Sequence, residues 1–210
     1  MTPEQAPAEN GGPPVAPERS ARRWILRRAE DAAELCRLCA GRARALVLAL
    51  RGARIGRKVR IGPRCTFERP WCLTLAERVC LEEGVYIKVT SDDAEVLIGA
   101  HTFLGRGTEL DVAREIRIGS HSLLAPGCFV TDHGHAFRRA SRRIDEQGCE
   151  VEPVRIGDDV WLGAGTVVLM GTTIGDGAGL GAASGVRKEV AAYGGFAGAP
   201  PLIDRVRDRV

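Results

Sequence analysis

Apolar residues recur at every sixth position over most of the chain, and this period restricts the possible folds more than any other feature. They come in successive groups of three, are interrupted after residue 130, and resume in phase at residue 156. The residue after each anchor is often glycine, and the fourth residue after it is usually small or β-branched. The anchors are Ile55, Ile61, Phe67, Leu75, Leu81, Ile87, Ile98, Leu104, Leu110, Ile118, Leu124, Val130, Ile156, Leu162, Val168, Ile174, Leu180 and Val186.

A period of six matches neither an amphipathic helix nor a plain alternating strand. It predicts a parallel β-helix, in which three short strands and three corners form one triangular coil. The anchors would fill a narrow prism, and successive coils would stack about 4.8 Å apart. An aromatic content of only 5% suits such a thin interior. We therefore expect an all-β fold with this β-helix over residues 53–190.

The remaining segments flank or interrupt the repeat. We expect a disordered leader over residues 1–19, and a basic amphipathic helical segment over residues 20–52 that Gly41 could split. A loop over residues 133–153 should protrude from the β-helix, and the tail over residues 191–210 should end in a short helix. The apolar stripe of the helical segment contains Ile25, Ala29, Ala32, Leu35, Cys36, Cys39, Ala43, Leu46, Val47 and Leu50.

Composition limits the setting in which the protein works. The N-terminus lacks the basic start and apolar stretch of a secretion signal, and no apolar run reaches the roughly 20 residues of a membrane span. Seven cysteines, an odd number scattered among repeat positions, predict reduced thiols and a cytoplasmic location. Cys36 and Cys39 form a C-x-x-C without a second ligand pair, so they are interpreted as small helix residues rather than a zinc site.

Positive charge is concentrated before the repeat. Residues 19–60 contain thirteen basic and three acidic side chains, although the whole chain carries a formal charge of only +3. One interpretation is a solvated arginine face over a stripe that covers the open end of the β-helix, where unpaired strand edges need a lid. The other is peripheral docking on an anionic membrane, at its inner face. Nucleic acid is disfavoured, because no aromatic residues are interleaved with the arginines.

The interruption of the repeat is the expected place for chemistry, since loops on a rigid scaffold often carry function. It begins with Asp132-His133-Gly134-His135. Two histidines separated by one residue in an extended segment point the same way. An imidazole titrates near neutrality and can accept a proton from an attacking hydroxyl. The alternative is a pair of loop histidines with local hydrogen bonds.

These features together resemble the hexapeptide-repeat O-acetyltransferases, which have a left-handed parallel β-helix. The resemblance rests on the repeat, on Asp132-His133-Gly134-His135, on the phrase from Pro153 to Ala164 (PVRIGDDVWLGA), and on Ala197-Gly198-Ala199-Pro200. In pattern the chain is similar to the maltose, galactoside and nodulation-factor acetyltransferases and to those acting on bacterial polysaccharides. The histidine loop followed by the D-D-V-W-L-G phrase is more specific than the repeat alone.

The resemblance implies a homotrimer with active sites between neighbouring protomers. It also implies direct transfer of an acetyl group from acetyl-CoA to a hydroxyl of a saccharide or glycoconjugate. His133 matches the general base of the family, and His135 is the reserve candidate. Trp161 matches a tryptophan that lies against the ligands, and a backbone N–H near Gly163 and Ala164 would stabilise the oxyanion. Positions matching Ala182, Arg187, Lys188 and Arg205 contact the coenzyme.

Two acidic residues near the histidines have open roles. Asp111 lies one coil before them and could hold sugar hydroxyls or orient His133. Asp132 either fixes the imidazole tautomer or only shapes the turn. The long basic loop, with Arg138, Arg139, Arg142 and Arg143, departs from the small sugar acetyltransferases and leaves the acceptor open.

Two other classes of function compete with acetyl transfer. A metalloenzyme similar to the γ-class carbonic anhydrases would use three of His101, His121, His133 and His135 as zinc ligands. His101 and His121 both follow their anchors by three residues and should face solvent. The spacing of the histidines does not match the motif of the γ-class carbonic anhydrases, so no bound metal is expected. A non-catalytic scaffold would bind a membrane or partner through its basic helices.

Overall fold

The computed structural model describes residues 17–197 and 202–206. The chain divides into two units, residues 1–39 and residues 40–210, and the boundary falls inside helix α1 (Pro17–Leu50). Most of the predicted leader, residues 1–16, lies outside the described residues. No helix in the described part of the chain is long and apolar enough to cross a membrane.

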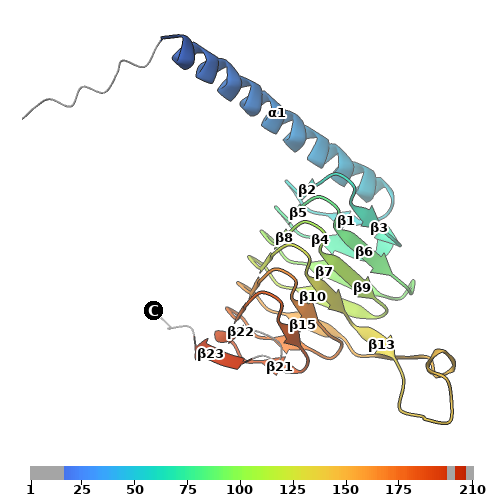
Figure 1. Cartoon of the computed structure of the whole chain (residues 1–210). Helices are drawn as coiled ribbons and strands as arrows, with labels where there is room; N and C mark the ends of the chain where they lie inside the picture. Colours follow the sequence, from blue (N-terminus) through green and yellow to red (C-terminus); the bar gives the residue numbers. More distant parts are fainter. Residues whose placement is uncertain (1–16, 198–201, 207–210) are drawn as a thin grey trace, which may run out of the picture. The chain divides into compact units, whose positions relative to one another are not determined.

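The repeat forms a left-handed parallel β-helix whose coils are stacked along one axis (Figure 1). Each coil contributes one short strand to each of three sheets. Sheet A contains β1 (Arg54–Ile55), β4 (Leu73–Leu75), β7 (Glu95–Ile98), β10 (Glu115–Ile118), β15 (Val154–Ile156), β18 (Thr173–Ile174) and β21 (Glu189–Val190). Sheet C contains β3 (Thr66–Phe67), β6 (Tyr86–Val89), β9 (Glu109–Val112), β12 (Phe129–Thr131), β17 (Val167–Val168) and β20 (Gly185–Val186).

Sheet B differs from the other two because it ends in an antiparallel strand. It contains β2 (Arg60–Ile61), β5 (Cys80–Leu81), β8 (Phe103–Leu104), β11 (Leu123–Leu124), β16 (Trp161–Leu162), β19 (Gly179–Leu180), β22 (Gly194–Ala197) and β23 (Leu202–Val206). The predicted short C-terminal helix is therefore wrong over residues 202–206. So short a helix is marginal by itself, whereas the open edge of β22 offers backbone hydrogen bonds to a strand.

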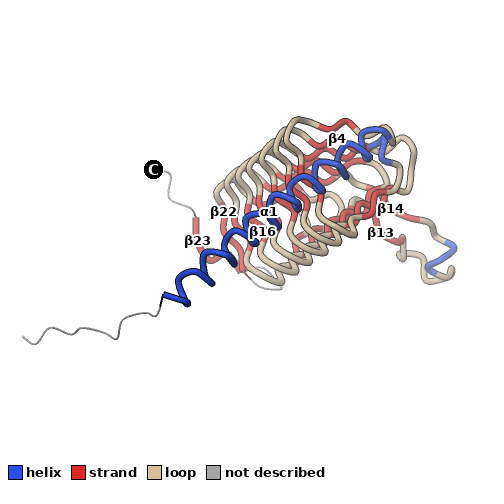
Figure 2. The backbone as a smooth tube through the Cα atoms, turned by 90° about the horizontal axis from the view of Figure 1, so that it is seen from above, coloured by secondary structure: helices blue, strands red, loops and turns tan. Residues whose placement is uncertain are grey.

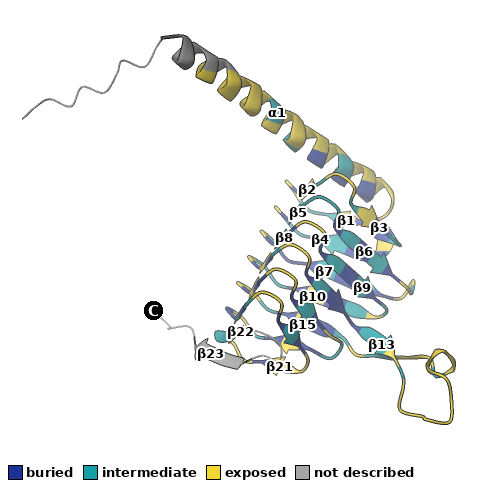
Figure 3. Ribbon diagram, viewed as in Figure 1, coloured by how far each residue is buried: buried dark blue, intermediate teal, exposed yellow. Residues whose placement is uncertain are grey.

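The anchors point into the prism, as the period predicts. In most two-residue strands the second residue is buried and the first faces outward, for example Leu162 and Trp161 in β16. From Ile61 to Val186 every anchor is buried, and Ile55 at the open end is half-buried (Figure 3). Since successive side chains of a strand alternate between faces, the outward residues of each sheet form rows across successive coils.

Small hydroxyl residues at the corners satisfy the backbone there. The buried hydroxyl of Thr102 donates to the carbonyl of Gly119 (2.6 Å), and that of Ser122 donates to the carbonyl of Gly157 (2.9 Å). Glycine follows many anchors because the next coil passes very close. A Cβ on Gly105 would lie 2.7 Å from the backbone nitrogen of Pro126.

Helix α1 is continuous through Gly41, so the predicted split is wrong. Gly41 allows close packing instead, since a Cβ there would lie 3.4 Å from the carbonyl oxygen of Ile61. Within residues 40–50 the helix covers the first coil, as the lid interpretation predicts. Gly41, Ala45 and Leu48 are buried, and Arg44 Nε donates to the carbonyl of Ile61 (2.7 Å).

The face that packs is not the predicted stripe. Leu46, Val47 and Leu50 belong to that stripe and are exposed. Small side chains on the Gly41–Ala45 side let the helix approach the coil, so the larger side chains point away from it. The prediction that the stripe covers the open end is therefore wrong, although its helical conformation is confirmed.

The interruption of the repeat is a β-hairpin rather than an irregular loop. Strands β13 (His133–His135) and β14 (Cys149–Val151) pair in antiparallel fashion, with Gly134 opposite Glu150. The hairpin leaves the stack of coils on one side (Figure 2). The short helix η2 (Ile144–Glu146) lies near its tip, and the other short helix, η1 (Pro70–Cys72), precedes β4.

Candidate active site

His133 lies where the chain leaves sheet C to enter the hairpin. Its side chain is 16% exposed, and its Nδ1 atom lies 3.1 Å from Oδ1 of Asp132. The hydroxyl of Thr131 accepts the backbone N–H of His133 (3.3 Å) and donates to its carbonyl (3.0 Å). A carboxylate accepts but does not donate, so this geometry assigns the Nδ1 proton to the neutral ring and leaves Nε2 as the acceptor.

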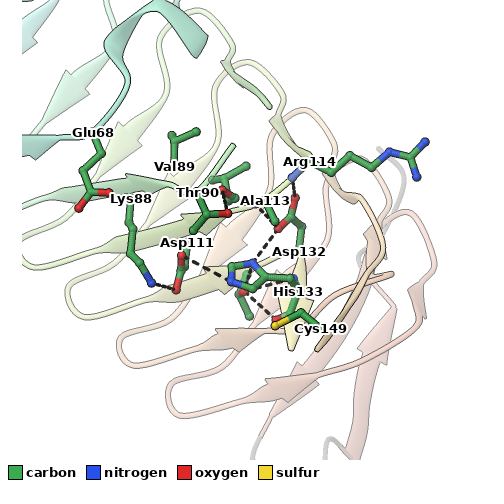
Figure 4. A network of polar contacts seen from close by, with 12 residues as sticks. Glu68, Lys88, Val89, Thr90, Asp111, Ala113, Arg114, Asp132, His133 and Cys149 are labelled. Carbon is green, nitrogen blue, oxygen red and sulfur yellow. Dashed lines mark hydrogen bonds and ion pairs between the residues drawn. The ribbon is translucent and has the colours of Figure 1, made fainter. Parts of the chain in front are cut away.

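Asp132 holds a turn of the preceding coil as well as the imidazole. Its carboxylate is completely buried and accepts backbone N–H groups from Ala113, Arg114 and Glu115, each at 2.7 Å (Figure 4). Both alternatives considered for Asp132 are therefore present in the geometry: it orients the ring and it shapes a turn. Four donors surround one carboxylate, which fixes its position.

Asp111 faces the other nitrogen of the ring. Its Oδ1 lies 3.8 Å from Nε2 of His133, too far for a direct hydrogen bond. This buried oxygen has no hydrogen-bond partner among the described residues, whereas Oδ2 accepts from Lys88 Nζ at 2.9 Å. The hydrogen bond to Asp111 raises the pKa of Lys88, so the ammonium stays charged at neutral pH. An acceptor oxygen and an acceptor nitrogen thus lie close to each other without a hydrogen bond between them.

Lys88 was missed by the sequence reasoning. It precedes Asp111 by one coil, and the two are direct neighbours in the register of β6 and β9. Aligning successive coils on their apolar anchors would have placed Lys88 next to Asp111. Tyr86, the outward residue before Lys88, donates to Glu68, and this bond together with burial raises its pKa to about 12.

His135 lies in a different environment. Its side chain is exposed, and its Nδ1 is 3.8 Å from Sγ of Cys149 on the facing strand. No described carboxylate contacts its ring. Of the two histidines, His133 has the environment of an oriented proton acceptor.

Trp161 occupies another sheet of the prism. It projects from β16 in sheet B, 51% exposed, next to the outward Leu123 of β11. With His121, Asp159, Gly177 and Gly179 these two residues line a groove of about 320 Å³. Within one chain, the structure does not combine this groove with Asp111, Asp132 and His133 on sheet C.

Three small residues of the predicted coenzyme site share one corner. Gly163 is buried, and a Cβ on it would clash with the backbone nitrogen of Ala182 in the next coil. Ala164 and Ala182 are exposed, and the carbonyl of Ala164 accepts the N–H of Ala183 (2.8 Å). Because the side chains at this corner are so small, a linear ligand can approach the backbone there.

The basic residues of the predicted coenzyme site lie elsewhere. Arg187 and Lys188 are exposed at the corner that follows β20, and Lys188 has a positive φ of 90°. Arg205 is in β23, where its backbone pairs with Gly195. Its side chain lies outside the described residues. Arg187 and Lys188 therefore do not share a corner with Ala164.

The remaining histidines do not form a metal site with these groups. The rings of His101 and His121 are stacked, with centroids 4.7 Å apart and planes 6° apart. Both residues are exposed corner residues with positive φ, as the sequence predicts for their orientation toward solvent. In the described part of the chain, no group of three metal-ligating side chains comes together.

Comparison with known proteins identifies the family. Residues 153–185 match a family model described as the hexapeptide repeat of succinyl-transferase. The Escherichia coli protein named "Putative colanic acid biosynthesis acetyltransferase WcaF" is 30% identical over 169 residues, which cover 80% of this chain and 75% of that protein. The chain belongs to the hexapeptide-repeat acetyltransferases.

Two further proteins give the extent of the similarity. The Mycobacterium tuberculosis protein named "Probable acetyltransferase Rv3034c" is 34% identical over 57% of this chain, and the match covers 40% of that relative. A hexapeptide-repeat acetyltransferase of Vibrio cholerae, solved with acetyl-CoA, superposes with a TM-score of 0.57. It is 24% identical, and the match covers 79% of this chain and 78% of that one. At this identity the superposition supports the fold.

Proposed function

We propose that the protein is an acetyl-CoA-dependent O-acetyltransferase acting on a hydroxyl of a saccharide or glycoconjugate. The observation that carries the proposal is His133, whose Nδ1 is held by buried Asp132 while Nε2 faces the unpartnered Oδ1 of Asp111. Family membership supplies the class of reaction, and the E. coli relative is named for colanic acid biosynthesis.

In the proposed reaction, Nε2 of His133 accepts the hydroxyl proton of the acceptor as its oxygen attacks the thioester carbonyl. The carbon–sulfur bond then breaks, and the imidazolium returns the proton to the departing thiolate. Asp132 keeps the Nδ1 proton in place, so Nε2 remains the basic atom. The negative charge of Asp111, 3.8 Å away, favours the imidazolium while it exists.

Asp111 also supports a saccharide as the acceptor. The oxygen Oδ1 of Asp111 and Nε2 of His133 are both hydrogen-bond acceptors, and they lie 3.8 Å apart. Two neighbouring hydroxyls of one sugar can satisfy them together, one donating to the carboxylate and the other losing its proton to the imidazole. An acceptor with a single isolated hydroxyl leaves the buried oxygen unsatisfied, which weakens its binding.

For the donor we propose the corner of Gly163, Ala164 and Ala182. Its small side chains leave room for an extended pantetheine chain, and the N–H near Ala164 is the proposed oxyanion donor. Arg187, Lys188 and Arg205 supply cations suited to the phosphates of the coenzyme. The acetyl-CoA in the Vibrio cholerae relative supports this donor.

A homotrimer is part of the proposal. Trp161 projects from sheet B and His133 from the end of sheet C, so each chain carries two separate halves of a site. When two copies lie side by side, the half with Trp161 in one copy can face the half with His133 in the other. Three copies that repeat this contact form a closed ring.

Thiol release from acetyl-CoA, measured with a panel of mono- and oligosaccharides, tests the chemistry. His133→Ala should lower kcat about a thousandfold, the range of general base catalysis. His135→Ala is the matched control and should retain activity within a few-fold. Undiminished turnover by His133→Ala would exclude the proposed base, and thiol release that no sugar stimulates would exclude a saccharide acceptor.

Mixing two variants that each lack one half of the proposed site tests whether the site is shared. When His133→Ala and Trp161→Ala chains are coexpressed with different tags, mixed assemblies should regain activity at interfaces that pair an intact His133 with an intact Trp161. Separately expressed variants, combined only in the assay, are the control. Mixed assemblies that stay inactive, or an active protein whose solution mass is that of one chain, would contradict the trimeric site.

A cytoplasmic location completes the proposal. All seven cysteines are free thiols, which is the state expected in a reducing compartment. Fractionation of cells that produce the full chain should recover it with the inner compartment or its membrane face. Recovery from the outside of the cell would contradict this part.

A further inference from the structure

Helix α1 presents an unused apolar face. Within residues 40–50, Gly41, Ala45 and Leu48 are buried against the first coil, whereas Leu46 is 63% and Leu50 is 80% exposed. At about 100° per residue these two sets lie on opposite sides of the helix. We name the exposed side the outer stripe; it contains Ala43, Leu46, Val47 and Leu50.

The first unit, described by itself, also carries exposed apolar side chains. Trp24 and Leu35 are 61% and 62% exposed, and they lie eleven residues, or about three turns, apart. The Arg28 guanidinium lies 5.2 Å from the centre of the Trp24 ring. Most of α1 is exposed in Figure 3. Alanines and cysteines widen the apolar side of this unit; they are Ala29, Ala32, Cys36 and Cys39.

Basic side chains lie next to the outer stripe. Arg42 and Lys58 line one groove with Leu46. Arg51 lines another groove with Val47. Within the first unit, Glu30 and Glu34 fall on the opposite side of the helix, and Asp31 lies at the edge of the apolar side. An apolar face bordered by arginine, lysine and tryptophan is typical of helices that lie on a membrane surface.

We infer that the outer stripe and its basic border dock on an anionic lipid bilayer. Leucine and valine side chains would enter the acyl boundary, and the cations would contact lipid phosphates. A second copy of the chain fits the same face poorly. Residues 19–60 carry thirteen basic and three acidic side chains, so two such faces would bring like charges together without acidic partners.

Sedimentation of the full chain with vesicles tests this inference. Vesicles of phosphatidylcholine mixed with phosphatidylglycerol should bind the protein at low salt and release it at high salt, whereas phosphatidylcholine alone should bind little. Leu50→Ser should weaken binding about tenfold, because an apolar side chain no longer enters the bilayer. Leu26→Ser, an exposed leucine on the other side of the helix, is the matched control.

Charge is tested by a second pair of variants. Arg42→Gln with Lys58→Gln should weaken binding about 25-fold, at roughly a fivefold factor for each cation. Arg106→Gln with Arg138→Gln removes the same charge elsewhere and should leave binding within about twofold. Equal loss in both pairs, or no binding of the unmodified protein to anionic vesicles, would overturn the inference.

Two further measurements separate this surface from the rest of the molecule. The lipid-free solution mass of Leu50→Ser should equal that of the unmodified protein. A smaller mass would show that the outer stripe binds another copy and would also overturn the inference. Thiol release with a soluble sugar should be unchanged in both lipid-binding variants, because neither changes the proposed site.

Discussion

Asp132 holds the imidazole of His133 with the same carboxylate that holds the backbone of the preceding coil. Oδ1 lies 3.1 Å from the ring Nδ1 and accepts the N–H of Ala113, while Oδ2 accepts those of Arg114 and Glu115. The ring orientation is thereby tied to a turn about one coil earlier. Rotation of the imidazole would remove one of four bonds from a buried carboxylate, so the ring is held in one orientation.

Asp132→Asn should therefore damage both the fold and the reaction. An amide nitrogen in place of one oxygen faces backbone donors, so the free energy of unfolding should fall by about 3 kcal/mol. The turnover number should fall as well, because the Nδ1 proton loses its partner. Urea unfolding and thiol release measure the two effects. Asp158→Asn is the control, since that exposed carboxylate accepts the N–H of Ser120 and should cost about 1 kcal/mol. Equal losses for the two variants would contradict the assigned role.

Lys88→Gln should raise the acceptor KM about tenfold while the fold remains intact, because Asp111 loses the ion pair that orients it. Steady-state rates at varied sugar concentration measure this. Lys88→Arg should restore part of the loss by renewing the ion pair. A rise in the acetyl-CoA KM instead would mean that the pair acts on the donor.

Two glycines should respond differently to the same methyl group. Gly105→Ala pushes a Cβ to 2.7 Å from the backbone nitrogen of Pro126 and should cost about 3 kcal/mol of stability. Gly185→Ala meets nothing within 4 Å and should be nearly neutral. Urea unfolding of both variants checks the comparison. A neutral Gly105→Ala would mean that the coils separate more easily than the packing indicates.

Glu115 should make stability depend on pH. The hydrogen bond from Arg155, together with Arg117, lowers its pKa, so the folded state binds this proton less readily than the unfolded state. The stability that Glu115 contributes is present above its pKa in the unfolded state. It is lost as pH falls through the lowered pKa of the folded state. Glu115→Gln should thus be less stable than the unmodified protein by about 0.5–1 kcal/mol at pH 7. The difference should begin to shrink as pH falls below the unfolded pKa of about 4.3, and it should vanish below the lowered folded pKa.

A double-mutant cycle with Arg155→Gln checks the origin of that difference. Each single variant removes the 2.9 Å contact between Arg155 and Glu115, so the double variant should add little to either. Strictly additive losses would assign the pH dependence to another group.

The sequence was most informative where one physical requirement repeats. Each coil needs an apolar residue inside, such as Leu104 or Leu162, and a small residue at the corner, such as Thr102 or Ser122. The period therefore predicted the strands and the core closely. The cluster around His133 was also predicted in part, because Asp132 stands at the break in the repeat and Asp111 lies one coil before it.

The sequence was less informative where tertiary packing decides which face of a helix is buried or whether a segment is a helix or a strand. Helical periodicity could not tell whether the stripe with Leu46 or the side with small residues such as Ala45 would contact the first coil. In the structure, the side with small residues packs against that coil. The end of the tail was predicted to be a short helix, yet residues 202–206 pair with the free edge of β22 as a strand. Lys88 was overlooked because its partner, Asp111, is 23 residues away and adjacent only through the register of the coils.

The strand that ends sheet B bears on how copies of the chain can assemble. β23 runs antiparallel to β22 and breaks register between Gly195 and Phe196. A further coil added there would require a parallel strand in regular register, so this edge does not template the end-to-end growth of a filament. On this sheet, the C-terminal end of the stack therefore presents the antiparallel strand β23 instead of the edge of a parallel strand.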